Sequence, residues 1–219
     1  YMTGYSQIDK FDDIGVAPFN LRENLLELIE NEIAFAKQGM PASIWGKMNS
    51  LADHKLIDAL YKASNAGVQI FLIVRSMCCL RPGIADLSEN ILVKSIVGRF
   101  LEHARIFCFG NGELLPSSAA KVFISSADWM PRNLDTRLEL MINISNQTVH
   151  QQILQQIMFA NLNDTANSWK LTPDGTYAPL FNERENFDAH EFFIHNSSLS
   201  GNGIGPYLVT PNLISMERD

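Results

Sequence analysis

Residues 68–74 read VQIFLIV, an almost uninterrupted apolar run in the 219-residue chain. Runs of this kind are typical of a strand that is buried on both faces of a sheet. Arg75 follows directly, at the carboxyl end of this predicted strand. Because open α/β sheets bind ligands at the carboxyl ends of their strands, Arg75 is a candidate binding residue. The simpler interpretation is a solvated arginine at a strand end.

The segments before this run begin with a strand-like and a helix-like pattern. Residues 14–18 are a short apolar run. Apolar residues then recur at helical spacing from Leu21 until Gly39 ends the pattern. Asn20 and Glu23 are spaced as a capping box at the start of this predicted helix.

A second helix and its flanking strands follow. Residues 42–45 have the pattern of a strand, and Asp53 is placed to cap a helix that Gly67 closes. The order strand, helix, strand, helix, strand predicts an α/β domain with a largely parallel sheet.

The second half of the chain adds strands, one helix and an irregular end. Beyond residue 163 the composition changes, and from about residue 181 Asn, Ser, Gly and Pro mix without a period. We therefore predict an α/β domain over residues 1–162, with a mostly parallel or mixed sheet flanked by helices. An irregular, partly flexible C-terminal extension over residues 163–219 follows. The individual expectations are strands at 93–97, 105–109, 121–124 and 138–144, a helix at 147–162 and a small hairpin or turn at 169–177.

His103 has the most informative neighbours of the five histidines. His103 and Arg105 are two positions apart at the start of a strand-like run, so their side chains are expected on the same face. Ser126 and Asp128 follow the next strand-like run and share a side by the same parity. A proton shuttle or nucleophile, a fixed cation and small oxygen-bearing side chains together indicate a phosphoryl site.

Simpler interpretations exist for the same residues. His103 fits equally well as a core histidine that is tied to a backbone carbonyl. Asp128 fits as a cap for a helix whose first turn contains Pro131. The other histidines are expected on solvated positions or in a tail without a scaffold: His54, His150, His190 and His195.

Composition limits the classes of partner. A net charge of −7 argues against general nucleic-acid binding. The stretch from Arg75 to Arg137 nevertheless has eight Lys/Arg and six Asp/Glu, which suits a confined anionic ligand better than a long duplex, although random surface variation also explains it.

Three cysteines form neither a disulfide framework nor a zinc pattern, which favours a reducing, intracellular compartment. The phosphate-loop patterns G-x-x-x-x-G-K-[ST] and G-x-G-x-x-G are missing, and GNGIG at residues 201–205 is interpreted as a flexible tail.

Several long segments are similar to one known family. They run ungapped from about residue 3 to residue 177, and on them the chain resembles the carboxyl-terminal part of class-one polyphosphate kinase. The main ones are MTGYSQ, VAPFNLRENLLELIENEI, LIDALYKASNAGV, IVRSMCCLRPGI, SIVGRFLEHARIF and ISSADWMPRNLD.

The resemblance implies a phospholipase D-like domain that supplies the second half of a shared active site. That family moves the terminal phosphoryl of ATP reversibly onto a histidine and then onto inorganic polyphosphate. His103 falls on the second-half histidine, in H-x-R form, and Arg75 falls on the arginine that contacts the nucleotide. The resemblance thus implies ATP or polyphosphate binding for both, and we expect His103 to be catalytic. Arg105, Ser126 and Asp128 are candidate supporting residues from their spacing alone. Ser76 stands where a glycine is usual.

The resemblance also implies what this chain lacks. The family's phosphorylated histidine, in an I-H-A-K-like context, and its magnesium-associated arginines belong to the other half of the site. Mg²⁺ is therefore expected to arrive with ATP in the parent enzyme, with no metal ligands in this chain, and the isolated chain is expected to be inactive or nearly so.

The implied partners are ATP or ADP, inorganic polyphosphate and the remaining domains of the same enzyme, not nucleic acid. The full-length enzyme is expected to be a cytoplasmic homo-oligomer, with peripheral attachment to the inner membrane as an alternative. Two other functions stay open. One is a phospholipase D-like phosphodiesterase in which two chains bring their His103 side chains together. The other is a non-catalytic module that binds polyphosphate.

Overall fold

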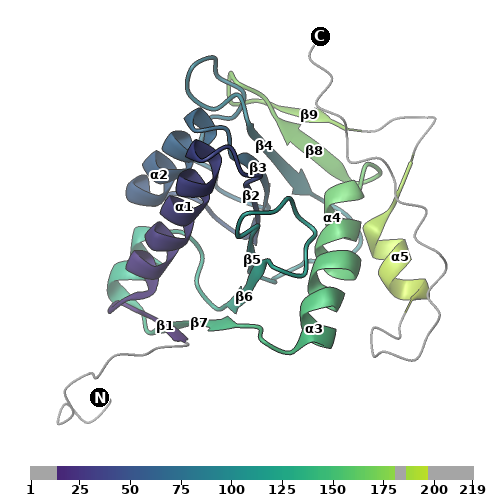
Figure 1. Cartoon of the computed structure of the whole chain (residues 1–219). Coiled ribbons are helices and arrows are strands. Elements are labelled where there is room, and N and C mark those ends of the chain that lie inside the picture. Colours follow the sequence, from purple (N-terminus) through teal and green to yellow (C-terminus); the bar gives the residue numbers. More distant parts are fainter. Residues whose placement is uncertain (1–13, 181–185, 197–219) are drawn as a thin grey trace.

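The computed structural model describes residues 14–180 and 186–196. In this part of the chain, helices cover both faces of one sheet, which gives three layers (Figure 1). The MTGYSQ segment at residues 2–7 and the GNGIG segment at residues 201–205 lie outside the described residues.

The sheet formed by the described residues has nine strands in the order β1-β7-β6-β5-β2-β3-β4-β8-β9. Parallel pairing joins β2 to β3 and β3 to β4, and the other neighbours pair antiparallel. The strands are β1 (Ile14–Ala17), β2 (Ser43–Met48), β3 (Gln69–Val74), β4 (Ile91–Ile96), β5 (Ile106–Phe109), β6 (Lys121–Ser125), β7 (Glu139–Asn143), β8 (Ser168–Leu171) and β9 (Tyr177–Pro179).

The connections explain why the sheet is mixed. Between β2 and β3 the chain returns through a helix, as parallel neighbours require. The strands β5, β6 and β7 instead lie side by side in sequence order and alternate in direction. The predicted α/β class with a mixed sheet is confirmed, and parallel pairing is limited to its centre.

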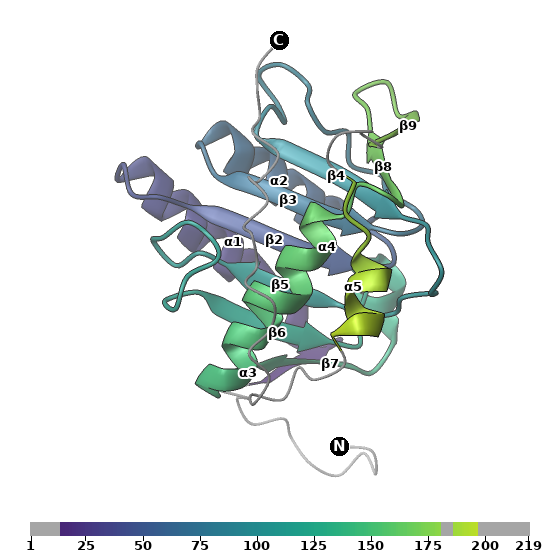
Figure 2. The same cartoon turned by 90° about the vertical axis from the view of Figure 1, so that its right-hand side faces the viewer.

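The helices form the two outer layers. One face is covered by α1 (Leu21–Lys37) and α2 (His54–Asn65) (Figure 1). The other carries a continuous helix made of α3 (Gln147–Gln151), η2 (Gln152–Met158) and α4 (Phe159–Asn163), with α5 (Ala189–His195) beside it (Figure 2).

The two predicted helix caps have different outcomes. Asp53 caps α2 as predicted, because its carboxylate accepts the backbone N–H of Leu56 at 3.1 Å. The capping box predicted for α1 is wrong. The side chain of Asn20 accepts the backbone N–H of Val16 at 2.7 Å instead, so it fixes the turn after β1 and makes no bond to the helix.

The apolar run at residues 68–74 forms β3 at the centre of the sheet, as its pattern predicted. Ile70, Leu72 and Val74 belong to the core beneath α1 and α2. Ile73 belongs to the second core, beneath the continuous helix of α3, η2 and α4. Because both faces of the strand are covered, an alternating apolar and polar pattern is not needed here.

Regular structure continues past residue 162. The strand β8 pairs with β4, and β9 pairs with β8, which confirms the predicted hairpin. The helix α5 packs against α4. The division at residue 162 stays a prediction, and the sheet itself continues across it.

Glu32 is a buried carboxylate that ties α1 to the sheet. It is 1% exposed, and its two oxygens accept the backbone N–H groups of Ser43 at 3.1 Å and Asn111 at 2.7 Å. Burial raises the pKa of this carboxyl, although the two backbone donors oppose that shift. Glu32 thereby fixes both the start of β2 and the turn after β5.

We expect Glu32→Ala to lower the free energy of unfolding by about 2–4 kcal/mol, because two buried N–H groups lose their acceptor. Glu32→Gln should lose less, since its single carbonyl oxygen still serves one donor. Urea denaturation measures both. The control is Glu30→Ala at an exposed position of the same helix, and a loss no larger than the control's would contradict the role of Glu32.

Candidate functional site

The loops that carry the predicted site residues meet at one edge of the sheet. Asn49 follows β2, Arg75 follows β3, and Asp128 comes soon after β6. Arg105 directly precedes β5, which runs antiparallel to β2 and β6, so the start of β5 lies at the same edge. The strand order thus gathers four segments that are far apart in sequence.

Backbone hydrogen bonds knit these loops together. Leu51 forms isolated bridges to both Cys78 and Trp129. The carbonyl of Trp129 also accepts the N–H groups of Ala52 at 2.8 Å and Asp53 at 2.9 Å. The side chains of this edge are therefore held on a fixed backbone, which is the property that a preorganised site requires.

Asp128 connects two of the segments through its carboxylate. Its Oδ1 accepts the backbone N–H groups of Asn49 at 2.7 Å and Ser50 at 3.2 Å. Its Oδ2 pairs with Arg105 Nη2 at 3.0 Å, and both side chains are at least nine-tenths buried. Asp128 therefore bridges loops of the sheet. The helical segment η1 (Arg132–Thr136) begins after Pro131 without a side-chain cap, so the alternative of a helix cap is wrong.

Arg105 links this buried carboxylate to His103. Its Nη1 lies 2.7 Å from His103 Nδ1 and donates to the backbone carbonyl of His103, also at 2.7 Å. The same Nη1 also lies 3.2 Å from His103 Nε2, so the guanidinium contacts both ring nitrogens. The ring itself is exposed, so the alternative of a buried core histidine is wrong.

Arg75 belongs to the same group of contacts. Its Nε and Nη2 donate to the side-chain oxygen of Asn49 at 3.1 and 2.6 Å. Its Nη1 donates to the backbone carbonyl of Glu102, the residue before His103. Arg75, His103, Arg105 and Asp128 are thus joined in one network.

Ser126 is differently engaged. Its hydroxyl donates to a carboxylate oxygen of Glu139 at 2.5 Å and accepts the backbone N–H of Leu140 at 3.1 Å. Both partners belong to β7. The hydrogen bonds of Ser126 therefore tie the end of β6 to the start of β7 and do not join Ser126 to the network of His103.

His190 is a residue that the sequence pattern missed. It was expected in a tail without a scaffold, and that expectation is wrong, because the residue is 1% exposed. Its Nδ1 accepts the backbone N–H of Phe100 at 3.3 Å, in the segment that leads to His103. The signal that could have found it is Asp188, which caps α5 by accepting the N–H groups of His190 and Glu191.

Two buried lysines lie on the same side of the sheet as α4 and α5. Lys47 contacts Glu102 and Asn161, and Lys94 donates to the backbone carbonyls of Leu162 and Asp164. Burial lowers the pKa of Lys47 to about 7, and the positive charge of Lys94 adds to that shift. Burial also lowers the pKa of Lys94 to about 7, against the opposing charge of Asp164.

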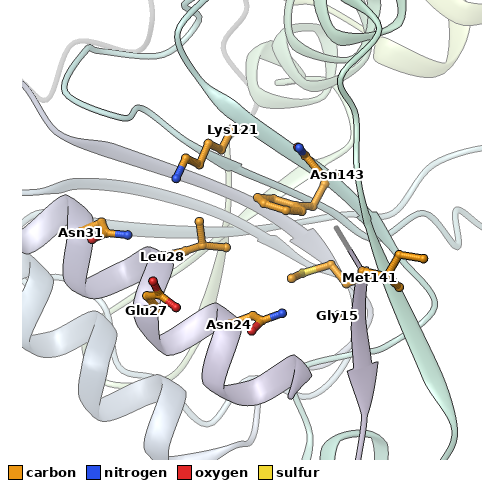
Figure 3. A pocket seen from close by; sticks show the side chains of 10 residues that line it. Gly15, Asn24, Glu27, Leu28, Asn31, Lys121, Met141 and Asn143 are labelled. Carbon is orange, nitrogen blue, oxygen red and sulfur yellow. The ribbon is translucent and has the colours of Figure 1, made fainter. Parts of the chain in front are cut away.

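A separate cavity of about 260 Å³ lies between α1, β1, β6 and β7. Figure 3 shows Asn24, Glu27 and Asn31 of α1 on one side of it, with Lys121 and Asn143 of the strands on the other. Lys121 begins β6 and Asn143 ends β7, so this cavity lies toward the strand ends opposite to those near His103. It does not include the predicted site residues.

The described residues contain neither a candidate metal cluster nor a candidate membrane span. Within residues 14–180 and 186–196, no three His, Cys, Asp or Glu side chains are grouped so that they could hold a metal ion. The helices of that part are too short or too polar to cross a membrane.

Comparisons with known proteins give one consistent family. The family model described as "Polyphosphate kinase C-terminal domain 2" matches residues 14–190. A polyphosphate kinase from Erythrobacter litoralis is 50% identical over 93% of this chain and 28% of its own length. A polyphosphate kinase from Pseudomonas aeruginosa is 51% identical over 75% of this chain and 23% of its own length.

A solved structure agrees with these relatives. The crystal structure of polyphosphate kinase from Porphyromonas gingivalis matches with a TM-score of 0.80 and 37% identity, over 87% of this chain and 28% of that one. The chain thus spans about a quarter of the length of the curated relatives it matches.

Removing the carboxylate of Asp128 tests the site's scaffold. We expect Asp128→Ala to lower the free energy of unfolding by about 3–5 kcal/mol, because Arg105 stays buried without its counter-ion. Asp128→Asn keeps one acceptor oxygen and should cost less. Urea denaturation measures both, with Asp58→Ala at an exposed position of α2 as the control. If Asp128→Ala unfolds at the same denaturant concentration as the control, Asp128 does not hold the loops together.

Proposed function

The chain belongs to the polyphosphate kinase family, and from this membership we propose that it is one part of an ATP:polyphosphate phosphotransferase. The proposed reaction transfers the terminal phosphoryl of ATP reversibly, through a phosphohistidine, to inorganic polyphosphate. The observation that carries the proposal is that Arg75 and His103 share one network at the strand ends, with the imidazole exposed.

The chemistry of these side chains fits phosphate. A guanidinium forms charge-assisted hydrogen bonds to phosphate oxygens in a planar geometry. Arg75 is already oriented by Asn49, so little side-chain freedom remains to be lost on binding. An imidazole can donate a proton to a phosphate oxygen or accept one near neutral pH. In this role, the imidazole of His103 would donate a hydrogen bond to the transferred phosphoryl group or exchange a proton with it.

We propose that this chain supplies one half of the active site. The chain covers about a quarter of its relatives' length, and its resemblance is to the second half of the family's active site. We propose that the phosphorylated histidine and the metal-associated groups come from the remaining domains of the same enzyme. We also propose that Mg²⁺ enters the site as a complex with ATP.

Binding of polyphosphate by the chain tests the two main residues. We expect Arg75→Ala and His103→Ala each to weaken binding about tenfold, because each removes a charge-assisted or polar contact to phosphate. Wild-type binding should also weaken as salt rises. Titration calorimetry at two ionic strengths measures both effects. The control is Lys62→Ala, an exposed lysine in the last turn of α2. An equal loss with the control would mean that the chain attracts polyphosphate by its general charge.

Labelling with magnesium and radiolabelled ATP tests the division of the active site. The purified chain should carry no more phosphohistidine than its His103→Ala variant, because groups that act as a unit fail together when half are missing. Stable phosphate on His103, above the level of that variant, would contradict the proposed role of this histidine.

A further inference from the structure

A buried polar cluster lies beneath the loop that carries His103. Its members are Lys47 of β2, Glu102 of the loop and His190 of α5. Lys47 is 4% exposed and His190 is 1% exposed. Buried polar groups of this kind are costly unless they are paired, so their placement needs a structural reason.

Glu102 connects the cluster to the proposed site. Its carboxylate pairs with Lys47, and its Oε1 lies 3.3 Å from His190 Nε2. Its backbone carbonyl accepts from Arg75. Since His103 is the next residue in the chain, holding Glu102 from both sides limits the movement of His103.

His190 also contacts the loop at Phe100, two residues before Glu102. Its Nδ1 accepts the backbone N–H of Phe100 at 3.3 Å, and the two rings are in contact, with centroids 5.3 Å apart. A neutral ring that accepts at Nδ1 carries its proton on Nε2, which faces Glu102. That Nε2 has no hydrogen bond of good geometry among the described residues, so its interaction with Glu102 is electrostatic. The bond at Nδ1 is therefore the one that fixes the loop.

Gly98 is an independent sign of this contact. A Cβ atom built at residue 98 would lie 2.6 Å from His190 Nδ1, far inside the usual contact distance. The φ angle at residue 98 is in the range that ordinary residues adopt. The imidazole, together with the side chain of Asn167 at 3.0 Å from the same Cβ position, leaves no room for a side chain at residue 98.

Buried groups also fix α5 itself. Asp164 is fully buried and accepts the backbone N–H of Ala189 at 2.9 Å, at the start of α5. Its other oxygen accepts from Asn167 and Ser168. The ammonium of Lys94 donates to the backbone carbonyl of the same aspartate at 2.7 Å. His190 is thus delivered to the loop by a rigid scaffold.

We propose that His190 is a positioning residue that holds the segment from Gly98 to Glu102, so that His103 and Arg75 face a common phosphate ligand. The inference rests on the proposed function, because the ligand is the polyphosphate or nucleotide of that site. In this proposal α5 supports the site from the carboxyl-terminal part of the described chain. His190 acts through the loop and makes no direct contact with the side chains of Arg75 and His103.

Amide hydrogen exchange of the full chain tests the proposal. In His190→Phe, the amides of Phe100 to His103 should exchange about tenfold faster, as expected for the loss of one hydrogen bond. In His190→Asn, the side-chain oxygen replaces Nδ1 as an acceptor, so exchange should stay close to wild type. The matched control is His195→Phe on the same helix, where the side chain is 74% exposed.

Two further readouts separate positioning from general stability. The NMR signals of the His103 ring should shift in His190→Phe and not in His195→Phe, and polyphosphate affinity should fall about fivefold under conditions where the variant is fully folded. Gly98→Ala, whose Cβ would crowd the imidazole and the side chain of Asn167, should reproduce the loop effects if His190→Phe fails to fold. Unchanged exchange and unchanged His103 signals in folded His190→Phe or Gly98→Ala would overturn the proposal.

The two proposals fail in different ways. If the wild-type chain does not bind polyphosphate, the proposed function loses its support, while hydrogen exchange and the His103 signals still decide the role of His190. If the wild type binds and folded His190→Phe binds equally well with an ordered loop, the positioning role is wrong and the proposed function stands.

Discussion

The carboxylate of Asp128 is the interaction on which the arrangement of the strand-end loops depends. One oxygen accepts two backbone N–H groups from the loop after β2, and the other pairs with Arg105 at the start of β5. Both charged groups are almost fully buried, so neither can exchange its partner for water without a large cost. This single side chain therefore sets the relative positions of three segments.

The same constraint leaves His103 accessible. Arg105 divides its donors between a buried carboxylate on one side and an exposed imidazole on the other. Arg75 reaches the group from the neighbouring strand through Asn49 and the carbonyl of Glu102. Two guanidinium groups thus stand beside one histidine in a chain whose net charge is −7. These positive charges suit the phosphate ligand that is proposed for the site.

The carboxyl-terminal elements extend this arrangement. The hairpin of β8 and β9 adds two strands to the sheet beside β4, and α5 brings His190 beneath the loop before His103. Buried Lys47, Lys94 and Asp164 form the polar layer between the sheet and α4 and α5. Such a layer fixes geometry more than it adds stability, because desolvation offsets most of the electrostatic gain.

Local patterns in the sequence predicted most of the elements and named the candidate site residues. The run at 68–74, the cap at Asp53 and the parity of His103 and Arg105 depend on neighbours within a few positions, and the similarity of long segments added the family. Pairings between distant residues were decided by the tertiary structure alone. Asn49 meets Asp128 across 79 positions, and Phe100 meets His190 across 90. The order and direction of the strands bring these residues together. Local sequence patterns do not determine that order, so these contacts could not be predicted from neighbouring residues.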